Sequence, residues 1–286
     1  MHPSHETDVR DPRRALGTVS EAVLAGPRRI LIASPMKCAS TYVAGTLAQY
    51  LGIDVPELEY DWLAEQNLTY ELRRQVRGRP FVLSLHMRPH AGNLAAARDD
   101  DVHVALLWRN IGDVVVSFDE HVPRYGAHNP IFFLDGEPFM RMPEQERYRF
   151  LIDALVPWSA GFYLHWSRLP SAPPFNPYGL LVADPPAYFR RILAGLGIEL
   201  DEARLRAAVA TRPAFTRLNK GVFGRSAERF DAETKRRLER RILQNPGRDE
   251  LEVLLWELPW EPLLLPRGSP RRREELARAW VAAALR

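Results

Sequence analysis

Lysine and cysteine are almost missing from this chain of 286 residues. Only three of its 39 basic residues are lysines, Lys37, Lys220 and Lys235, so arginine supplies nearly all of the positive charge. The single cysteine, Cys38, excludes a disulfide framework within the chain and fits a reducing, cytoplasmic setting. The positions of the few lysines are therefore worth following.

Long hydrophobic runs are also missing. No run of about 18 apolar residues occurs, which excludes a membrane-spanning helix, and residues 1–14 are polar and lack the apolar core of a secretory signal. A strong charge excess is absent as well, because the formal net charge is +3 and basic residues alternate with acids. This balance disfavours nucleic acid as a partner and favours a small anionic ligand. The hydrophobic fraction of 46% excludes a disordered class.

Apolar runs of strand length alternate with helical patterns along most of the chain. Buried parallel strands are expected at 29–34, 81–85, 102–108 and 179–183. Helices are expected at 41–51, 113–125, 144–166, 186–196 and 231–243. The alternation predicts an α/β fold, with a central parallel β-sheet flanked by helices, built as a single domain over residues 1–286.

Two stretches do not follow this alternation. Residues 119–143 are rich in proline, glycine and aromatic side chains and show no clear periodicity, so they are expected to form a functional flap. Residues 270–286 predict a terminal helix with one apolar face. That face either docks on the domain or forms a contact in a homodimer.

The first motif that could carry chemistry is a strand, a short loop and a helix over residues 30–47. Ser40 and Thr41 fall where the helix would start, so their hydroxyls and the free backbone N–H groups could converge on a phosphate beside Lys37. The order of a Walker A loop, GxxxxGK[ST], is absent. The alternative is a Ser/Thr pair that caps an ordinary helix.

Two further motifs could add cations to this site. Arg109 closes a predicted strand and Ser117 follows eight residues later, so Arg109 is placed to bind a second phosphate. It could equally pair with Asp113 on the surface. The third motif is a glycine-punctuated loop that contains Arg217 and Lys220, and its alternative is a flexible connection.

The three motifs together resemble the sulfotransferases that use 3′-phosphoadenosine 5′-phosphosulfate, a family with a P-loop-NTPase-like three-layer sandwich. The resemblance implies that the 5′-phosphosulfate loop consists of Lys37, Cys38, Ala39, Ser40, Thr41 and Tyr42. It implies that Arg109 and Ser117 bind the 3′-phosphate of the donor. It also implies that the segment beginning Asn219, Lys220, Gly221 closes over the nucleotide.

Several positions depart from the family pattern. Cys38 and Ala39 replace Ser-Gly, and Tyr42 replaces a tryptophan that stacks on adenine, a role that a tyrosine ring can keep. Asn219 replaces an arginine that helps to hold the 3′-phosphate, so Arg217 or Arg225 would have to substitute for it. By the same resemblance, the other face of the adenine site is assigned to Phe215.

The resemblance also points to a catalytic base. His86 follows the second predicted strand, where many relatives carry the histidine that removes the acceptor proton. The alternatives are a capping or packed histidine at this position, or Glu120 or His121 as the base.

The implied reaction moves a sulfuryl group to a hydroxyl or amine of a small acceptor and leaves adenosine 3′,5′-bisphosphate. Lys37 would stabilise the departing oxygen, and no metal is required. Aromatic and methionine side chains of the flap, with Met36 and Met87, favour an acceptor with a hydrophobic part, although core filling is the competing account. The sequence offers no metal-ligand spacing.

Two other functions fit part of these observations. A nucleotide-dependent small-molecule kinase shares the phosphate site, but it needs an acidic residue at a strand end to hold Mg²⁺, where this chain has Trp108 and Arg109. A non-catalytic nucleotide-binding protein is the second alternative.

Overall fold

The computed structural model describes residues 26–58, 65–126, 131–132, 134–211, 213 and 221–244. The strands are β1 (Arg29–Ala33), β2 (Phe81–Leu85), β3 (His103–Trp108) and β4 (Phe175–Pro177). The helices are α2 (Ser40–Leu51), α3 (Tyr70–Gln75), α4 (Ala91–Asp99), α5 (Ile111–Asp119), α6 (Val122–Tyr125), α7 (Gly136–Arg141), α8 (Glu144–Ser167), α9 (Tyr178–Ala183), α10 (Pro185–Gly195), α11 (Glu202–Ala210), α12 (Arg225–Arg229) and α13 (Ala232–Leu243). The predicted helix at 270–286 lies outside the described residues.

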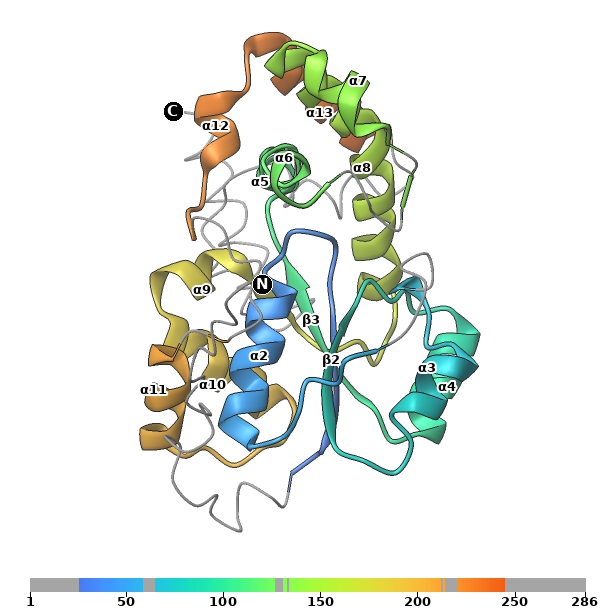
Figure 1. Ribbon diagram of the computed structural model, residues 1–286, viewed down its shortest axis with the longest axis vertical. Helices are drawn as coiled ribbons and strands as arrows, with labels where there is room; N and C mark the ends of the chain where they lie inside the picture. Colours follow the sequence, from blue (N-terminus) through green and yellow to red (C-terminus); the bar gives the residue numbers. More distant parts are fainter. Residues whose placement is uncertain are drawn as a thin grey trace, which may run out of the picture.

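The four strands form one parallel sheet in the order β2-β1-β3-β4 (Figure 1). Because β1 lies between β2 and β3, the chain passes to one side of β1 to form β2 and then crosses to the other side to form β3. Open parallel sheets bind ligands at such a switch point, at the carboxyl ends of the strands. The segments after β1, β2 and β3 therefore meet at one edge of the sheet.

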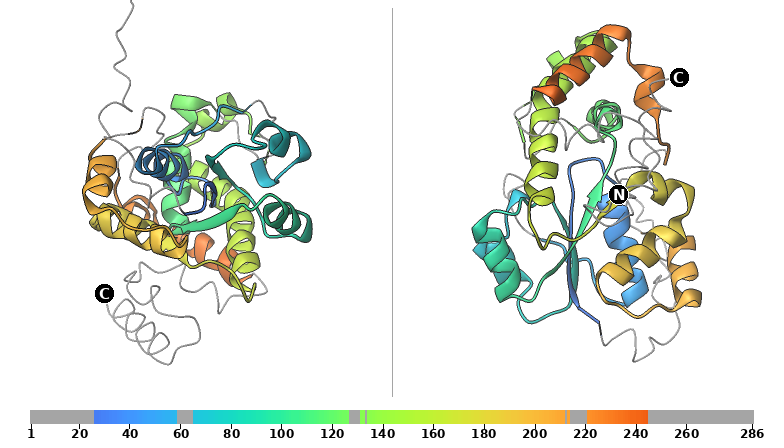
Figure 2. Two further views of the ribbon diagram at one scale, coloured as in Figure 1. Left: turned by 90° about the horizontal axis from the view of Figure 1, so that it is seen from below. Right: turned by 180° about the vertical axis from the view of Figure 1, so that it is seen from behind.

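Alternate residues of β1 divide the core into two halves. Leu31 and Ala33 pack with α3, α4, α5, α8 and α13, whereas Ile30 and Ile32 pack with α2, α9, α10 and α11. All four side chains are fully buried, as expected for a strand covered on both faces. Figures 1 and 2 show α2, α9, α10 and α11 on one side of the sheet and α3, α4 and α8 on the other, with α5 and α13 beyond the carboxyl ends of the strands. The three-layer α/β architecture predicted from the sequence is confirmed.

The fourth predicted strand is wrong. Residues 179–183 belong to helix α9, and the strand is the preceding segment, Phe175–Pro177. Asn176 lies in this strand and donates its side-chain N–H to the Leu106 carbonyl of β3 at 2.9 Å. Residues 179–181 of this apolar run are buried, and Val182 and Ala183 are exposed. A short apolar run fits a helix as well as a buried strand, so periodicity could not separate the two.

The predicted helix at 113–125 is divided in two. Helix α5 ends at Asp119, and α6 begins at Val122 with Pro123 in its first turn, where proline is tolerated. Helices α6 and α7 both lie within the segment 119–143, the predicted flap, whose sequence shows no clear periodicity. Helices α2, α8, α10 and α13 match their predictions to within one or two residues at each end.

Candidate functional site

The loop after β1 adopts an unusual backbone. Lys37 and Ala39 both have left-handed conformations, with φ of 62° and 64°. Residues with a Cβ pay about 1–2 kcal/mol for this conformation, and such strain is concentrated at functional sites. Ala39 is also the N-cap of α2, and its methyl group cannot accept a hydrogen bond from the first turn. Ser40 and Thr41 lie inside the helix, so the alternative of an ordinary Ser/Thr cap does not hold.

The Cys38 side chain points into the core beneath this loop. It is 1% exposed, and its Sγ lies 4.0 Å from the hydroxyl of Tyr163 on α8. Burial raises the pKa of the thiol to about 12. A thiol in that state is neither a nucleophile nor a metal ligand. Cys38 is therefore a packing group at the loop.

Arg109, the residue after β3, joins the loop to two other segments. Its guanidinium donates from Nη1 to the Lys37 carbonyl at 2.9 Å and from Nη2 to the Val222 carbonyl at 3.3 Å. The guanidinium also lies 4.1 Å from the centre of the Tyr178 ring. Arg109 is 4% exposed and its Nη2 is 3.9 Å from Asp113, so the pairing with Asp113 exists but is buried rather than on the surface.

Asp113 attaches the glycine-punctuated loop to α5. Its two carboxylate oxygens accept hydrogen bonds from the backbone N–H groups of Gly224, at 2.8 Å, and Ser226, at 2.9 Å. The two segments approach closely at Gly112, where an added Cβ would lie 2.6 Å from the Ser226 Oγ. This contact requires glycine. The loop from Gly221 onward is thereby held beside Arg109.

The remaining predicted donor-binding residues are placed as follows. Ser117 is buried in α5, and Tyr42 is buried in α2 with its ring centre 6.2 Å from that of Phe189. Gly221 has a φ of 63°, a conformation that favours glycine. The residues Phe215, Arg217, Asn219 and Lys220 lie outside the described part of the chain.

His86 lies on the other side of the same loop. It follows β2, which pairs with β1 on the side opposite β3. Its Nδ1 is 2.8 Å from the Ser34 carbonyl, and a carbonyl oxygen only accepts, so Nδ1 carries the proton. Its Nε2 is 3.4 Å from Glu65 Oε2. The ring packs edge-on against Trp158 of α8, with centres 6.1 Å apart. His86 therefore presents Nε2 toward Glu65.

The two alternative bases have other contacts. Glu120 forms ion pairs with Arg225 and with Arg229. These pairs hold its carboxylate and also occupy Arg225, which was expected to be able to substitute for the arginine missing at Asn219. The ring of His121 packs against Phe118, with centres 6.2 Å apart.

Several side chains assigned to an apolar acceptor site fill the core instead. Met36, Met87 and Phe139 are each less than a tenth exposed and belong to the same core cluster. Met140 of α7 is 37% exposed. The methionine pattern is thus explained largely by core packing, the competing account.

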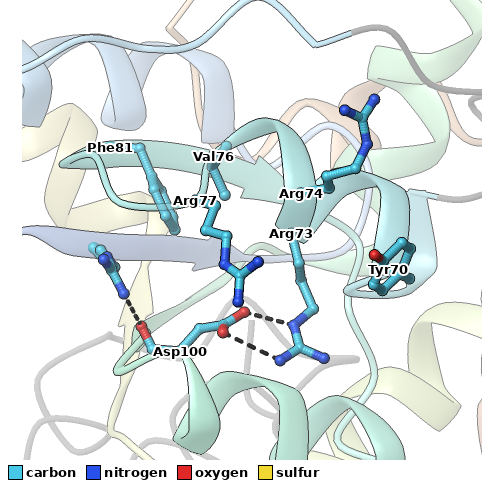
Figure 3. A pocket seen from close by; sticks show the side chains of 8 residues that line it. Tyr70, Arg73, Arg74, Val76, Arg77, Phe81 and Asp100 are labelled. Carbon is cyan, nitrogen blue, oxygen red and sulfur yellow. Dashed lines mark hydrogen bonds and ion pairs between the residues drawn. The ribbon is translucent and has the colours of Figure 1, made fainter.

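A second group of cations lies at the opposite edge of the sheet (Figure 3). Four arginines, Arg29, Arg73, Arg74 and Arg77, line a pocket there with Asp100, at the amino ends of β1 and β2. Arg73 donates to the two carboxylate oxygens of Asp100 at 2.5 and 3.1 Å, and Arg29 donates to its backbone carbonyl at 2.8 Å. Sequence patterns gave no sign of this cluster, because Asp100 and Arg73 are 27 residues apart.

Sequence reasoning also missed three residues beside the predicted site. Glu65 faces His86, Trp158 packs on it, and the Tyr163 hydroxyl accepts from the Arg109 N–H at 3.0 Å and donates to the Arg109 carbonyl at 3.1 Å. Trp158 and Tyr163 lie in a predicted helix, where nothing in the pattern separates them from core residues. Among the described residues, no group of histidine, cysteine or acidic side chains could hold a metal ion, and no helix is long and apolar enough to cross a membrane.

Comparison with known proteins gives structural matches only. No family model matches the chain, and no curated protein matches it in sequence. Its structure is similar to that of mouse sulfotransferase SULT7A1 complexed with PAP, with a TM-score of 0.54, 15% identity and coverage of 92% of this chain and 94% of that one. It is also similar to retinol dehydratase in complex with androsterone and the inactive cofactor PAP, with a TM-score of 0.51, 15% identity and coverage of 78% and 82%. The chain therefore has the sulfotransferase fold.

Proposed function

We propose that this protein is a sulfotransferase that uses 3′-phosphoadenosine 5′-phosphosulfate as donor. The observation that carries the proposal is the meeting of three segments at the switch point of the sheet. There the buried guanidinium of Arg109 holds the left-handed loop at Lys37 and the glycine loop at Val222, and His86 lies across the same loop. Two proteins with this fold are described with PAP bound, which supports the choice of donor.

Donor binding is assigned to the loop and its neighbours. The helix start at Ser40 and Thr41 suits the 5′-phosphate, because the first turn of α2 presents N–H groups and the positive end of its dipole. Arg109 and Ser117 are proposed to bind the 3′-phosphate. The remaining assignments, made on the family pattern, are Lys37, Cys38, Ala39, Tyr42, Phe215, Arg217, Asn219, Lys220 and Gly221.

The transfer itself is an in-line displacement. The acceptor oxygen or nitrogen forms a bond to sulfur while the bond from sulfur to the bridging oxygen breaks, and that electron pair leaves with adenosine 3′,5′-bisphosphate. His86 takes the acceptor proton on Nε2, since Nδ1 already donates to Ser34. The ammonium of Lys37 stabilises the charge that develops on the departing oxygen.

The kinase alternative is disfavoured by Asp113. A phosphotransferase of this fold class needs a carboxylate near the strand ends to hold Mg²⁺. Both oxygens of Asp113, the carboxylate nearest Arg109, accept backbone N–H groups from Gly224 and Ser226. This carboxylate therefore holds the loop at Gly224 and Ser226 against α5.

Calorimetry tests the proposal directly. We expect adenosine 3′,5′-bisphosphate to bind without Mg²⁺ and to bind more tightly than ATP–Mg²⁺. We expect the His86→Ala enzyme to keep this affinity and to lose transfer. Preferential binding of ATP–Mg²⁺ would contradict the proposal, and full activity of His86→Ala would assign the proton transfer to another group.

The acceptor is proposed to be a small molecule with a hydroxyl or amine and a hydrophobic part. Retinol dehydratase, which has this fold, is described in complex with androsterone, and this supports the class. A panel of phenols, alcohols and amines, compared with anionic polysaccharides, tests it. Turnover confined to the polysaccharides would overturn this assignment without touching the donor assignment.

A further inference from the structure

We propose that Glu65 is a positioning residue for His86: its carboxylate orients the imidazole and stabilises the imidazolium that forms when His86 takes the acceptor proton. The inference rests on the proposed function, because it assigns a role within that reaction. It concerns a residue that the family motifs do not reach, since Glu65 lies between the phosphate loop and β2.

The contacts of the His86 ring suit the imidazolium that forms during the reaction. Nδ1 must donate to the Ser34 carbonyl, 2.8 Å away, so in the neutral ring Nε2 has a lone pair. The Nε2 atom lies 3.4 Å from Glu65 Oε2, so in the neutral ring two electron-rich atoms lie close together. A proton on Nε2 changes this repulsion into attraction. The arrangement therefore stabilises the imidazolium once the ring has accepted the acceptor proton.

The position of Glu65 is fixed by hydrogen bonds between its own segment and neighbouring parts of the protein. The backbone N–H of His86 donates to the Glu65 carbonyl at 2.8 Å, which extends the pairing at the end of β2. The next residue, Gln66, accepts from the Trp158 indole N–H at 3.0 Å and from the Asn93 side chain at 3.1 Å. Trp158 thus packs on His86 and also holds the segment that carries Glu65.

Asn93 is the centre of this support. It is 2% exposed, and its side-chain oxygen accepts from the Leu68 N–H at 2.9 Å while its NH₂ group donates to the carbonyls of Gln66 and Arg88. One buried amide therefore ties residues 66–68 to the segment that follows His86. Buried polar networks with satisfied partners hold a single geometry.

Other charged groups near His86 come from two neighbouring segments. The loop that contributes the Ser34 carbonyl carries Lys37, and the segment after β2 carries Arg88, whose guanidinium lies 4.9 Å from the centre of the Trp158 ring. Burial lowers the pKa of Arg88. Helix α8 contributes the neutral indole of Trp158 to this contact. Among the groups described around His86, Glu65 is the one negative charge that contacts the ring, so it supplies the stabilisation.

The proton follows a balanced path. The acceptor O–H or N–H bond breaks, its proton moves to Nε2 of His86, and the acceptor atom bonds to sulfur as the bisphosphate leaves. The resulting imidazolium lies between the Ser34 carbonyl and the Glu65 carboxylate. It returns the proton to solvent after the products leave. A carboxylate in this role changes no bond and acts on the histidine alone. Unlike the aspartate of the serine hydrolase triad, which contacts the other ring nitrogen, Glu65 lies beside the nitrogen that takes the proton.

The test compares Glu65→Gln and Glu65→Asp with Glu71→Gln, a matched control on the exposed face of α3 where Glu71 pairs only with its own helix. We expect Glu65→Gln to lower kcat about 10- to 100-fold with bisphosphate affinity unchanged, Glu65→Asp to recover part of the loss, and Glu71→Gln to have no effect. Activity of Glu65→Gln should also persist to lower pH than that of the unmodified enzyme, because the imidazolium has lost its carboxylate.

The double variant separates this role from a direct one. If Glu65 acts through His86, then Glu65→Gln lowers the residual rate of His86→Ala no further. An additional loss in the His86→Ala background would show that Glu65 acts independently, and an unchanged kcat in Glu65→Gln would also overturn the inference. Failure of the unmodified protein to bind adenosine 3′,5′-bisphosphate would instead contradict the proposed function.

Discussion

The arginines at the two edges of the sheet, at the amino ends and at the carboxyl ends of its strands, have different hydrogen-bond partners. At the amino edge, Arg73 binds both carboxylate oxygens of Asp100, and Arg74 binds both of Glu71 (Figure 3). At the carboxyl edge, the hydrogen bonds of Arg109 go to main-chain carbonyls, and the carboxylate of Asp113 is occupied by backbone N–H groups. A count of arginines does not separate these two environments, but their partners do.

The difference indicates where an anion can bind. A guanidinium that is matched by a carboxylate has its field cancelled locally, as shown by Asp100, whose pKa is lowered mainly by its hydrogen bonds from Arg73. The guanidinium of Arg109 has the carboxylate of Asp113 3.9 Å away, but its hydrogen bonds go to neutral carbonyls, so its charge is cancelled less than that of Arg73. This difference supports the carboxyl edge as the proposed phosphate site.

The largest effect is expected from Arg109→Gln. Loss of this buried cation removes the proposed contact to the donor and the link between the loops at Lys37 and Val222. Calorimetry should show about 100-fold weaker binding of adenosine 3′,5′-bisphosphate. Arg73→Gln is the matched control and should leave the affinity unchanged, and equal losses in the two variants would remove the distinction between the edges.

Backbone strain gives the next comparison. Ala39 and Asp101 both have positive φ, 64° and 51°, at opposite edges of the sheet. Ala39→Gly should raise the free energy of unfolding by about 1 kcal/mol, because glycine adopts this conformation without strain. Asp101→Gly should gain less, since aspartate tolerates the left-handed region better than alanine does. Urea unfolding of both variants measures the difference, and an equal gain would show that the strain is not specific to the phosphate loop.

The ion pair at the amino edge should contribute less, and its contribution should depend on pH. Arg73 and Asp100 are 31% and 33% exposed, so Arg73→Gln should cost about 0.5–1 kcal/mol near pH 7. Because the pKa of Asp100 is lowered in the fold, this stability is present above the ordinary pKa of aspartate and is lost as the pH falls through the lower, folded value. Unfolding curves of the two proteins should therefore converge in acid. A difference that stays constant with pH would exclude the ion pair as its cause.

The smallest effect is expected at Cys38. With a pKa raised to about 12 by burial, its thiol should not react with iodoacetamide at pH 8 in the folded protein and should react fully in urea. Mass spectrometry detects the adduct. Rapid modification of the folded protein would show that the loop above Cys38 opens readily.

The sequence was sufficient to place Lys37, Arg109 and His86 at one edge of the sheet. Each follows a strand with a nearly continuous apolar run, and the carboxyl ends of parallel strands share an edge, so no contact had to be known. Donor-site residues in the range 214–220 stay predictions, because they lie outside the described residues.

Glu65 and the fourth strand could not be placed in this way. Glu65 lies in a segment without periodicity, and only tertiary hydrogen bonds to His86 and through Asn93 bring it to the site. Phe175–Pro177 is too short for a pattern, and it is recognised as a strand by its parallel pairing with β3, to which the Asn176 side chain adds a hydrogen bond. Both depend on contacts between distant parts of the chain, which local patterns do not record.

Helix α8 sets the spacing between two parts of the proposed active site. Trp158 contacts His86 at the end of β2, and Tyr163 is hydrogen-bonded to the main chain of Arg109 at the end of β3. These residues are separated by about 7.5 Å along the axis and by well over a full turn of helix. Insertion or deletion of one residue between them would rotate one contact by about 100° relative to the other. Chains that share this arrangement should therefore tolerate changes of length in the loops around α8 more readily than within residues 158–163.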